Sequence, residues 1–168
     1  MANAVLITPC LWQLKLGMVN SYLIEMEDGL LLIDTGHPHS ADKIFVAVRE
    51  AGHDPARIRH LLLTHCHADS AAEVRRRTGA RVDAHVADAA LLSQGIGTRP
   101  GTTRAPGLTA ALVYFFVIKN ATTSYEPIPV DQLVQHGEVL PLAGGLEEFT
   151  RQAIAPGRSR CFCGKTAC

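Results

Sequence analysis

The sequence predicts a layered α/β fold, because strand patterns alternate with helix patterns along the chain. Two apolar runs, Leu30–Ile33 and Leu61–Leu63, have the length and flanks of buried strands. Between them, residues 41–48 place apolar side chains at i, i+3, i+4 and i+7, which is the stripe of an amphipathic helix. Val82, Ala84 and Val86 then alternate with polar side chains, which indicates a further strand over residues 80–86.

Two more strands precede these elements. Residues 11–16 and 21–26 have strand patterns, and Asp28-Gly29 after the second is a strong signal for a tight turn into Leu30–Ile33. The helix that follows is expected to begin at a Ser40 cap and to run to Ala51. Gly52 is expected to end it in the left-handed conformation.

The remainder of the chain gives less uniform signals. A helix is expected over residues 71–78, with Gly79 at its end. Residues 93–107 are rich in Gly, Thr and Pro and are expected to form a loop, whereas residues 108–118 fit either a helix or a strand. Residues 133–142 predict a hairpin.

The most informative stretch joins the run Leu61–Leu63 to the helix that follows it. It contains His65, His67 and Asp69, which alternate, so that in an extended segment the three side chains point to the same side. Imidazole nitrogens and carboxylate oxygens are ligand types that zinc accepts. The alternative is a turn or a surface cluster without a metal, and this pattern alone favours neither.

Three segments in this order, Asn20–Ile24, Leu31–Gly36 and Leu63–Asp69, resemble the N-terminal half of the metallo-β-lactamase superfamily, in particular its glyoxalase II-like hydrolases. The resemblance runs from about Gly17 to Leu146. It implies the N-terminal part of an αββα sandwich of two sheets between two helical layers.

The same resemblance implies roles for individual side chains. His65 and His67 would bind a first zinc ion. Asp69 would bind a second zinc ion and orient the nucleophile, which makes it the candidate catalytic residue. For Asp34, which ends the strand Leu30–Ile33, the resemblance implies that its carboxylate orients a neighbouring ligand. A turn-forming Asp without that role is the alternative.

The ligand set is incomplete compared with the family. Ser70 directly follows Asp69, where the family has a further His. Residues 70–73 instead have the sequence of a capping box, which would begin the next helix. His37, His39 and His85 are expected to face solvent, and a single-zinc site completed by one of them is a further alternative.

The end of the chain differs in character. Residues 1–146 are expected to form an incomplete metallo-β-lactamase-like domain, and residues 147–168 a tail outside the family, because the tail shows little periodicity. Back-translation of residues 148–157 in a shifted reading frame permits a His-Thr-Pro-Gly-His-Ser-Pro-Gly motif like that of the family, which suggests a frame-shifted, truncated member. The coding DNA is then expected to continue as family sequence in that frame, and an early stop codon there would end the hypothesis.

Composition narrows the class of protein. A chain of 168 residues with 47% hydrophobic and 19% charged residues predicts one globular domain rather than a disordered chain. A net charge of zero argues against a nucleic-acid partner. The longest apolar run, residues 108–118, is too short to cross a membrane. Five cysteines, an odd number that looks unpaired, favour a cytoplasmic location.

The resemblance to the metallo-β-lactamase superfamily implies a zinc-dependent hydrolase of small ester, thioester or lactone-like substrates by ancestry, and the incomplete ligand set implies that its activity is impaired in this chain. The family holds one or two zinc ions, and we expect this incomplete set to bind zinc weakly or not at all. The alternative is a non-catalytic remnant or interaction module that has lost its metal centre. Such a half-sandwich would expose an apolar sheet face and self-associate through it.

Overall fold

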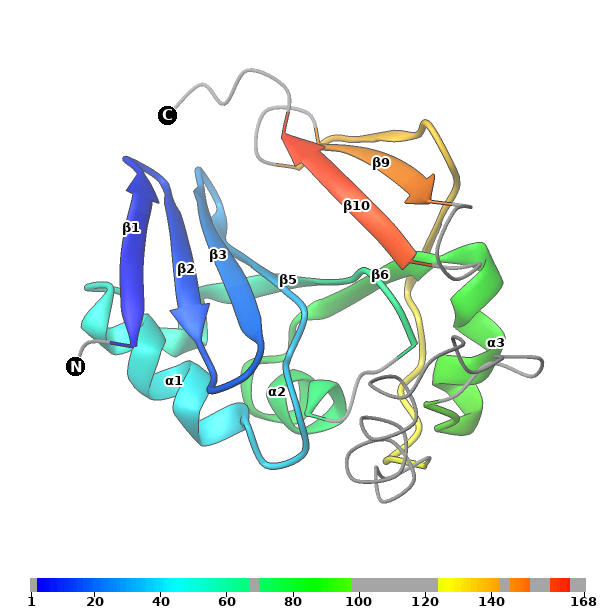
Figure 1. Ribbon diagram of the computed structural model, residues 1–168, viewed down its shortest axis with the longest axis horizontal. Coiled ribbons are helices and arrows are strands. Elements are labelled where there is room, and N and C mark those ends of the chain that lie inside the picture. Colours follow the sequence, from blue (N-terminus) through cyan, green and yellow to red (C-terminus); the bar gives the residue numbers. More distant parts are fainter. Residues whose placement is uncertain (1–2, 67–69, 98–123, 143–145, 152–157, 164–168) are drawn as a thin grey trace, which may run out of the picture.

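The computed structural model describes residues 3–66, 70–97, 124–142, 146–151 and 158–163. Within them the chain forms a seven-stranded sheet of order β1-β2-β3-β4-β5-β6-β7 and a three-stranded sheet of order β10-β9-β8. The helices lie along one face of the larger sheet and the smaller sheet lies over the other (Figure 1). This layering confirms the α/β class and the N-terminal part of the expected sandwich.

Between residues 11 and 85, the bounds of the elements follow the predicted pattern closely. The larger sheet contains β1 (Ala4–Thr8), β2 (Leu11–Lys15), β3 (Asn20–Met26), β4 (Gly29–Ile33), β5 (Ile58–Leu63), β6 (Arg81–His85) and β7 (Gln132–Val134). The smaller sheet contains β8 (Val139–Leu140), β9 (Leu146–Arg151) and β10 (Arg158–Cys163). The helices are α1 (Ala41–Glu50), α2 (Ala71–Thr78) and α3 (Val86–Gln94), with a short 3-10 turn, η1 (Pro55–Arg57).

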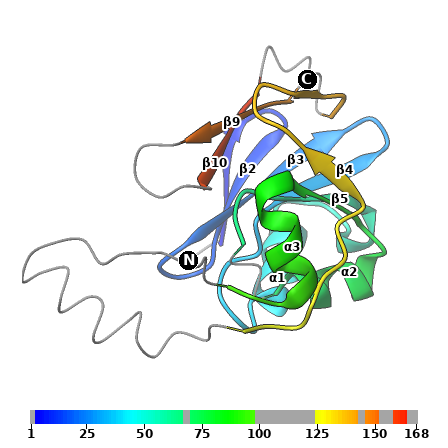
Figure 2. The ribbon, with the colours of Figure 1, turned by 90° about the vertical axis from the view of Figure 1, so that its right-hand side faces the viewer.

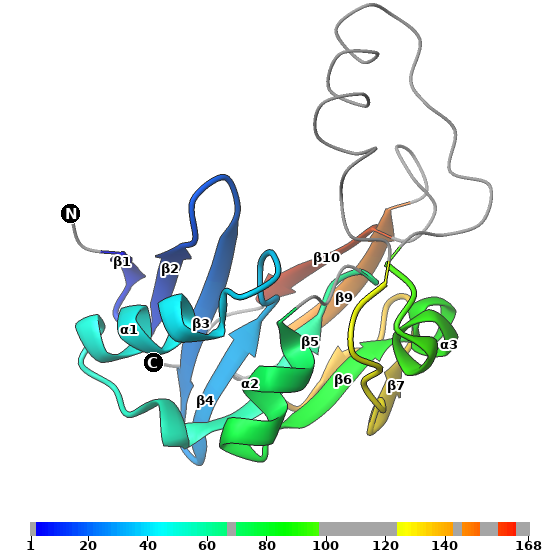
Figure 3. The ribbon, with the colours of Figure 1, turned by 90° about the horizontal axis from the view of Figure 1, so that it is seen from below.

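Strand direction changes across the larger sheet. Strands β1 to β4 pair antiparallel with their neighbours, as consecutive hairpins do. Strands β4 to β7 pair in parallel, with α1, α2 and α3 among the connections (Figure 3). The carboxyl ends of β4 and β5 therefore meet at one edge of the sheet, which is where ligand sites of parallel sheets form.

The core has one cluster on each face of this sheet. The helical face buries the predicted apolar stripe of α1, including Ile44, Phe45 and Val48. All five residues of β4 are buried, because both of its faces are covered. The second cluster lies on the other face and consists of Ile24, Leu31, Ile33, Leu62, Val134 and Leu140.

The second cluster corrects one expectation. Its six side chains are at most 8% exposed, and one of them, Leu140, comes from strand β8 of the smaller sheet. Figure 2 shows β9 and the larger sheet as separate layers on this side of the molecule. The expected exposed apolar face is therefore wrong for these six side chains, while self-association stays a prediction.

The predicted hairpin over residues 133–142 is also wrong. Gly137 does adopt a left-handed conformation, with φ of 75°, as the turn requires. However, β7 pairs in parallel with β6, and β8 pairs antiparallel with β9. The chain thus changes sheets at this turn instead of folding back on itself. Farther on, β9 and β10 pair antiparallel, although the sequence shows little strand periodicity there.

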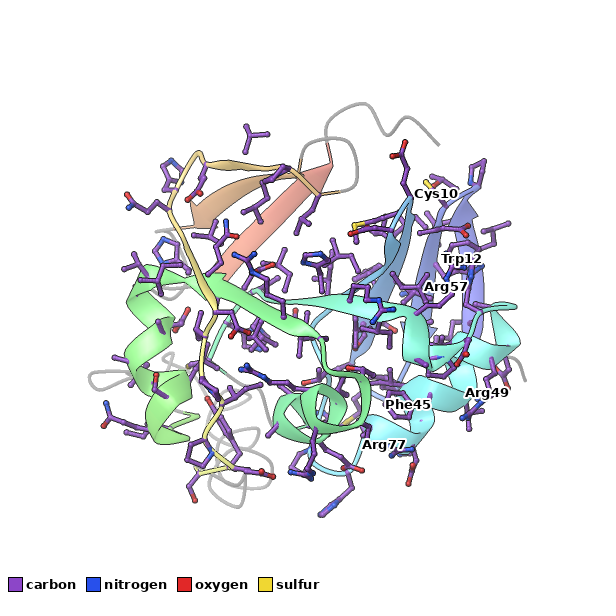
Figure 4. The ribbon with its side chains drawn as sticks, turned by 180° about the vertical axis from the view of Figure 1, so that it is seen from behind. Cys10, Trp12, Phe45, Arg49, Arg57 and Arg77 are labelled. Atoms are coloured by element: carbon purple, nitrogen blue, oxygen red, sulfur yellow. The ribbon has the colours of Figure 1, made fainter. Side chains whose placement is uncertain are left out.

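Helices α1 and α2 are joined through Arg77. Its guanidinium lies 4.1 Å from the centroid of the Phe45 ring on α1 (Figure 4). Its Nη1 donates to the carboxylates of Asp42, at 2.7 Å, and Glu73, at 3.1 Å. The hydrogen bond to Asp42 raises the pKa of Arg77. These contacts fix α2 against α1, and so fix the element that follows the candidate ligands.

A carboxylate is buried on the second face of the sheet. Asp83 is 1% exposed, and its Oδ2 lies 3.6 Å from His60 Nδ1 while its Oδ1 lies 3.4 Å from Arg81 Nε. Burial raises the pKa of Asp83, and the charges of Arg81 and His60 oppose this only in part. Because the pKa is raised in the folded state, the contribution of this carboxyl to stability is fully present below its unfolded pKa of about 3.9. It is lost as the pH rises from that value through the pKa in the folded state.

The variant Asp83→Asn is therefore expected to lose this pH dependence. Between about pH 4 and pH 7, the wild type should lose about 1.4 kcal/mol of unfolding free energy relative to the variant for each unit by which the pKa is raised. Urea unfolding at several pH values measures this. Asp28→Asn is the control, because Asp28 also faces His60, at 3.9 Å, but its side chain is 69% exposed. Parallel profiles for wild type and Asp83→Asn would contradict the expectation.

Candidate metal centre

The candidate site begins where β4 and β5 end side by side. Asp34 follows β4, and its backbone N–H donates to the carbonyl oxygen of Leu62 on β5 at 3.0 Å. Its carboxylate accepts twice from Thr64, which follows β5: from the backbone N–H at 2.9 Å and from the hydroxyl at 2.6 Å. Asp34 thus connects the end of β4 to Thr64, the first residue of the segment that carries the candidate ligands.

Asp34 makes these contacts from a conformation that most residues avoid. Its φ is 59°, in the left-handed region, where an L residue other than Gly costs about 1–2 kcal/mol. Asp tolerates this region better than most residues do, and such strain persists where surrounding contacts determine the conformation. The three hydrogen bonds to Leu62 and Thr64 supply that determination.

His65 is connected to Asp34 through Thr64. Its Nδ1 lies 2.9 Å from the Thr64 hydroxyl oxygen but 3.8 Å from Asp34 Oδ1, which is beyond hydrogen-bond distance. The imidazole is about one-third exposed, at 33%. An imidazole that binds a metal through one nitrogen usually engages its other nitrogen in such a hydrogen bond. His65 therefore fits a metal ligand.

The other predicted ligands, His67 and Asp69, lie outside the described residues. Of the predicted set, the structure places His65 alone. Within the ranges that the structure describes, no group of three or more His, Cys, Asp or Glu side chains gathers in a way that would hold a metal ion. The predicted site residues His65, His67 and Asp69 therefore stay a prediction as a set.

The capping box predicted at Ser70 is wrong in its hydrogen bonds. Ser70 does lie at the start of α2, but its side chain makes no capping hydrogen bond there. Its hydroxyl donates to the carbonyl oxygen of His37 at 2.7 Å and accepts from the Ser40 N–H at 2.9 Å. Its backbone, with φ of −107° and ψ of 3°, is not the extended conformation that an N-cap uses. The hydroxyl instead joins α2 to the loop after β4.

Two smaller expectations at helix starts are also corrected. Ser40 precedes α1, as predicted, but makes no side-chain capping hydrogen bond. The expectation that His85 faces solvent is wrong: it is only 9% exposed, because its Nδ1 accepts from the Ala87 N–H at 3.1 Å and caps α3. His37 and His39 are exposed, as predicted.

A second support for the ligand segment comes from far along the chain. The Tyr125 hydroxyl donates to the carbonyl oxygen of Cys66 at 2.5 Å, and the Tyr125 N–H donates to the carbonyl oxygen of Gly95 at 2.9 Å. The Cys66 thiol donates to the carbonyl oxygen of Gly97 at 3.7 Å, and the residue is 4% exposed. Cys10, by contrast, is disulfide-bonded, so the prediction of unpaired cysteines is wrong there. No local signal in the sequence points to Tyr125, because its partner is 59 residues away.

Gly95 offers a test of this support. A Cβ at Gly95 would meet the carbonyl oxygen of Tyr125 at 2.2 Å, and φ there is 69°. We expect Gly95→Ala to lower the unfolding free energy by about 3 kcal/mol, from left-handed strain and displaced backbone together. Gly79→Ala is the matched control, because Gly79 also ends a helix, with φ of 73°, but its Cβ would meet no atom within 4 Å. It should cost about 1 kcal/mol. Equal losses in thermal or urea unfolding would contradict the steric argument.

Comparison with known proteins gives one family. The family model described as "Metallo-beta-lactamase superfamily" matches residues 14–158. The match extends past Leu146, into the stretch that the sequence predicts to be a tail outside the family.

Solved structures with the same fold include three from different bacteria. BJP-1, a subclass B3 metallo-beta-lactamase of Bradyrhizobium japonicum, is 24% identical with a TM-score of 0.74, and the match covers 97% of this chain and 58% of that one. A metallo-beta-lactamase of Cronobacter sakazakii with a HARLDQ motif is 26% identical with a TM-score of 0.72, covering 94% and 58%. FEZ-1 of Legionella gormanii is 20% identical with a TM-score of 0.72, covering 96% and 58%.

This chain thus spans between 53% and 58% of the length of the solved structures compared. Across the described ranges, none of the helices has the length and the hydropathy that a bilayer crossing requires.

Proposed function

The chain belongs to the metallo-beta-lactamase superfamily, and on this basis we propose that it is a zinc-dependent hydrolase of small ester, thioester or lactone-like substrates, with impaired activity. His65 and His67 would hold a first zinc ion, and Asp69 would hold a second and orient the nucleophile. Bound zinc supplies a nucleophile at neutral pH and polarises a carbonyl oxygen.

The observation that carries this proposal is the connection of Asp34, Thr64 and His65. A surface histidine in a turn needs no fixed partner at Nδ1. Here the ring nitrogen meets a hydroxyl at 2.9 Å, and that hydroxyl donates to a carboxylate at 2.6 Å. Partners of this kind orient metal-binding imidazoles and raise their basicity. The strained φ of 59° at Asp34 is consistent with a function for this connection, because strain of this kind clusters at functional sites.

The proposed impairment follows from Ser70. Its hydroxyl already has a donor and an acceptor, the Ser40 N–H and the His37 carbonyl, in a site that is 2% exposed. It therefore does not replace the His that the family resemblance places there. The HARLDQ motif of the Cronobacter sakazakii protein likewise ends in a residue other than His. That motif departs from the family's His-x-His-x-Asp-His pattern at two positions, with Arg at the third, where this chain has His67, and Gln at the last.

Activity is tested on the full chain after incubation with zinc. We expect slow turnover of a nitrophenyl ester, an aryl thioester or a lactone that is abolished by a chelator and by His65→Ala. His39→Ala is the control, because His39 is an exposed histidine outside the proposed site. Turnover that survives His65→Ala would place the chemistry elsewhere. No zinc-dependent turnover of any of the three substrates would favour the non-catalytic interpretation.

A further inference from the structure

We propose that Thr64 is a positioning residue that fixes which ring nitrogen of His65 carries the proton. Its hydroxyl would hold the hydrogen on Nδ1 and so leave the lone pair on Nε2. The proposal rests on the proposed function in one respect, namely that this lone pair is the one offered to zinc. The state of the ring itself is a property of the protein without metal.

The inference comes from counting protons. A hydroxyl has one hydrogen to donate, and an ionised carboxylate has none. Asp34 Oδ1 accepts from the Thr64 N–H at 2.9 Å, and Asp34 Oδ2 accepts the hydroxyl hydrogen at 2.6 Å. The only hydrogen of the hydroxyl is then committed to Asp34. Towards His65 Nδ1, at 2.9 Å, the Thr64 oxygen can act only as an acceptor. The hydrogen in that contact must therefore come from the imidazole.

A neutral imidazole carries one N–H, so the lone pair lies on the opposite nitrogen, Nε2. Asp34 does not impose this state directly, since its Oδ1 is 3.8 Å from Nδ1. The Asp34 carboxylate instead acts on the His65 tautomer through Thr64, because it fixes the direction in which the Thr64 hydroxyl hydrogen points. The backbone hydrogen bond from Asp34 to Leu62 and the position of Thr64 directly after β5 keep the carboxylate, the hydroxyl and the imidazole aligned.

His85 provides a comparison within the same protein, because its contacts imply the opposite tautomer. Its Nδ1 accepts from the backbone N–H of Ala87 at 3.1 Å. A nitrogen that accepts has no hydrogen, so the neutral ring of His85 carries its hydrogen on Nε2. His65 and His85 are therefore expected to be opposite tautomers in one protein.

The tautomers are measured by NMR on metal-free full chain with 15N-labelled histidine, at about pH 8, where an ordinary imidazole with a pKa near 6.5 is neutral. We expect Nδ1–H for His65 and Nε2–H for His85. Single His65→Gln and His85→Gln variants assign the signals. If His65 is found as Nε2–H in the wild type, the proposal is wrong.

Three substitutions separate the causes. Thr64→Ser keeps the hydroxyl and should keep Nδ1–H. Thr64→Val removes the acceptor and should yield a mixture of tautomers. Asp34→Asn should change the His65 tautomer from Nδ1–H to Nε2–H. The amide oxygen still accepts from the Thr64 N–H, so the amide nitrogen donates to the Thr64 hydroxyl oxygen. The hydroxyl hydrogen is then free to be donated to His65 Nδ1. Thr78→Val is the control, because the Thr78 hydroxyl is also hydrogen-bonded, to Val74 at 2.8 Å, but lies at the end of α2.

Zinc affinity is the second measurement. Thr64→Val and Asp34→Asn are expected to weaken binding by about 10–100-fold, and Thr64→Ser to restore it. If the His65 ring stays Nδ1–H in both Thr64→Val and Asp34→Asn, the proposal is overturned. It is also overturned if zinc affinity is unchanged in a variant whose His65 tautomer has shifted. If the tautomers behave as expected but the wild type binds no zinc, the proposed function fails while the assignment of the ring stands.

Discussion

Replacing Asp34 with Ala is expected to lower the free energy of unfolding by about 3 kcal/mol. The substitution removes both carboxylate oxygens that accept hydrogen bonds from Thr64. Hydrogen bonds to charged groups contribute about 1.5–3 kcal/mol each when they are not replaced by water. It also places Ala at a φ of 59°, which costs more for Ala than for Asp. In a chain of this size the loss corresponds to roughly 6–12 °C in Tm.

Two variants separate the contributions to the Asp34→Ala result. Asp34→Gly also lacks the carboxylate but relieves the backbone, so it should recover about 1 kcal/mol relative to Asp34→Ala. Asp28→Ala removes an exposed carboxylate and should change stability by less than about 0.5 kcal/mol. Thermal unfolding of all four proteins measures both differences. If Asp34→Ala is as stable as Asp28→Ala, the carboxylate does not hold the two strand ends together.

Introducing the family's His at position 70 is expected to damage the protein rather than complete its metal set. Ser70→His removes a hydroxyl that satisfies the Ser40 N–H and the His37 carbonyl, at about 1–3 kcal/mol. It also forces a larger side chain into a site that is 2% exposed, which typically costs a further 1–3 kcal/mol, roughly. We expect a combined loss of about 4 kcal/mol and no gain in bound zinc.

The matched variant Ser70→Ala isolates the hydrogen bonds. It should cost about 1–3 kcal/mol, and the difference from Ser70→His then measures the steric contribution. Urea unfolding gives both values, and metal analysis of the same samples gives zinc per chain. A stable Ser70→His protein that binds an additional zinc ion would show that position 70 still faces the metal site, contrary to the structure.

The parts of the fold that the sequence predicts are those with local causes. The run Leu30–Ile33 is apolar throughout because β4 is covered on both faces, and the stripe of α1 repeats because one side of that helix is buried. Gly52 and Gly79 follow α1 and α2 with φ of 88° and 73°, as the stop signals predict.

The errors come from partners that are distant in sequence. Residues 133–142 contain a real turn at Gly137, but a turn does not specify whether the next strand joins the same sheet or another one. Ser70 has the local sequence of a capping box, yet its partners Ser40 and His37 are 30 and 33 residues away. The backbone of Ser70, not its sequence context, directs the hydroxyl to them.

The candidate site divides in the same way. The sequence predicts His65 as a ligand from its spacing and from the family resemblance, and Asp34 as its supporting carboxylate. It does not predict Thr64, although the Thr64 hydroxyl makes the connection between them. The available signal is a hydroxyl residue immediately before the first His, at the end of a buried strand. Its meaning depends on β4 lying parallel beside β5, which brings Asp34 within reach.

Zinc content per chain, measured on purified and dialysed protein, tests the central claim most directly. Because the ligand set is incomplete, we expect a sub-stoichiometric but measurable amount of zinc in the wild type and in His39→Ala, and loss of that zinc in His65→Ala. This result would show a metal site built on the His65 imidazole. A wild type that retains no zinc, or a His65→Ala variant that retains as much as the wild type, would contradict the proposed metal centre.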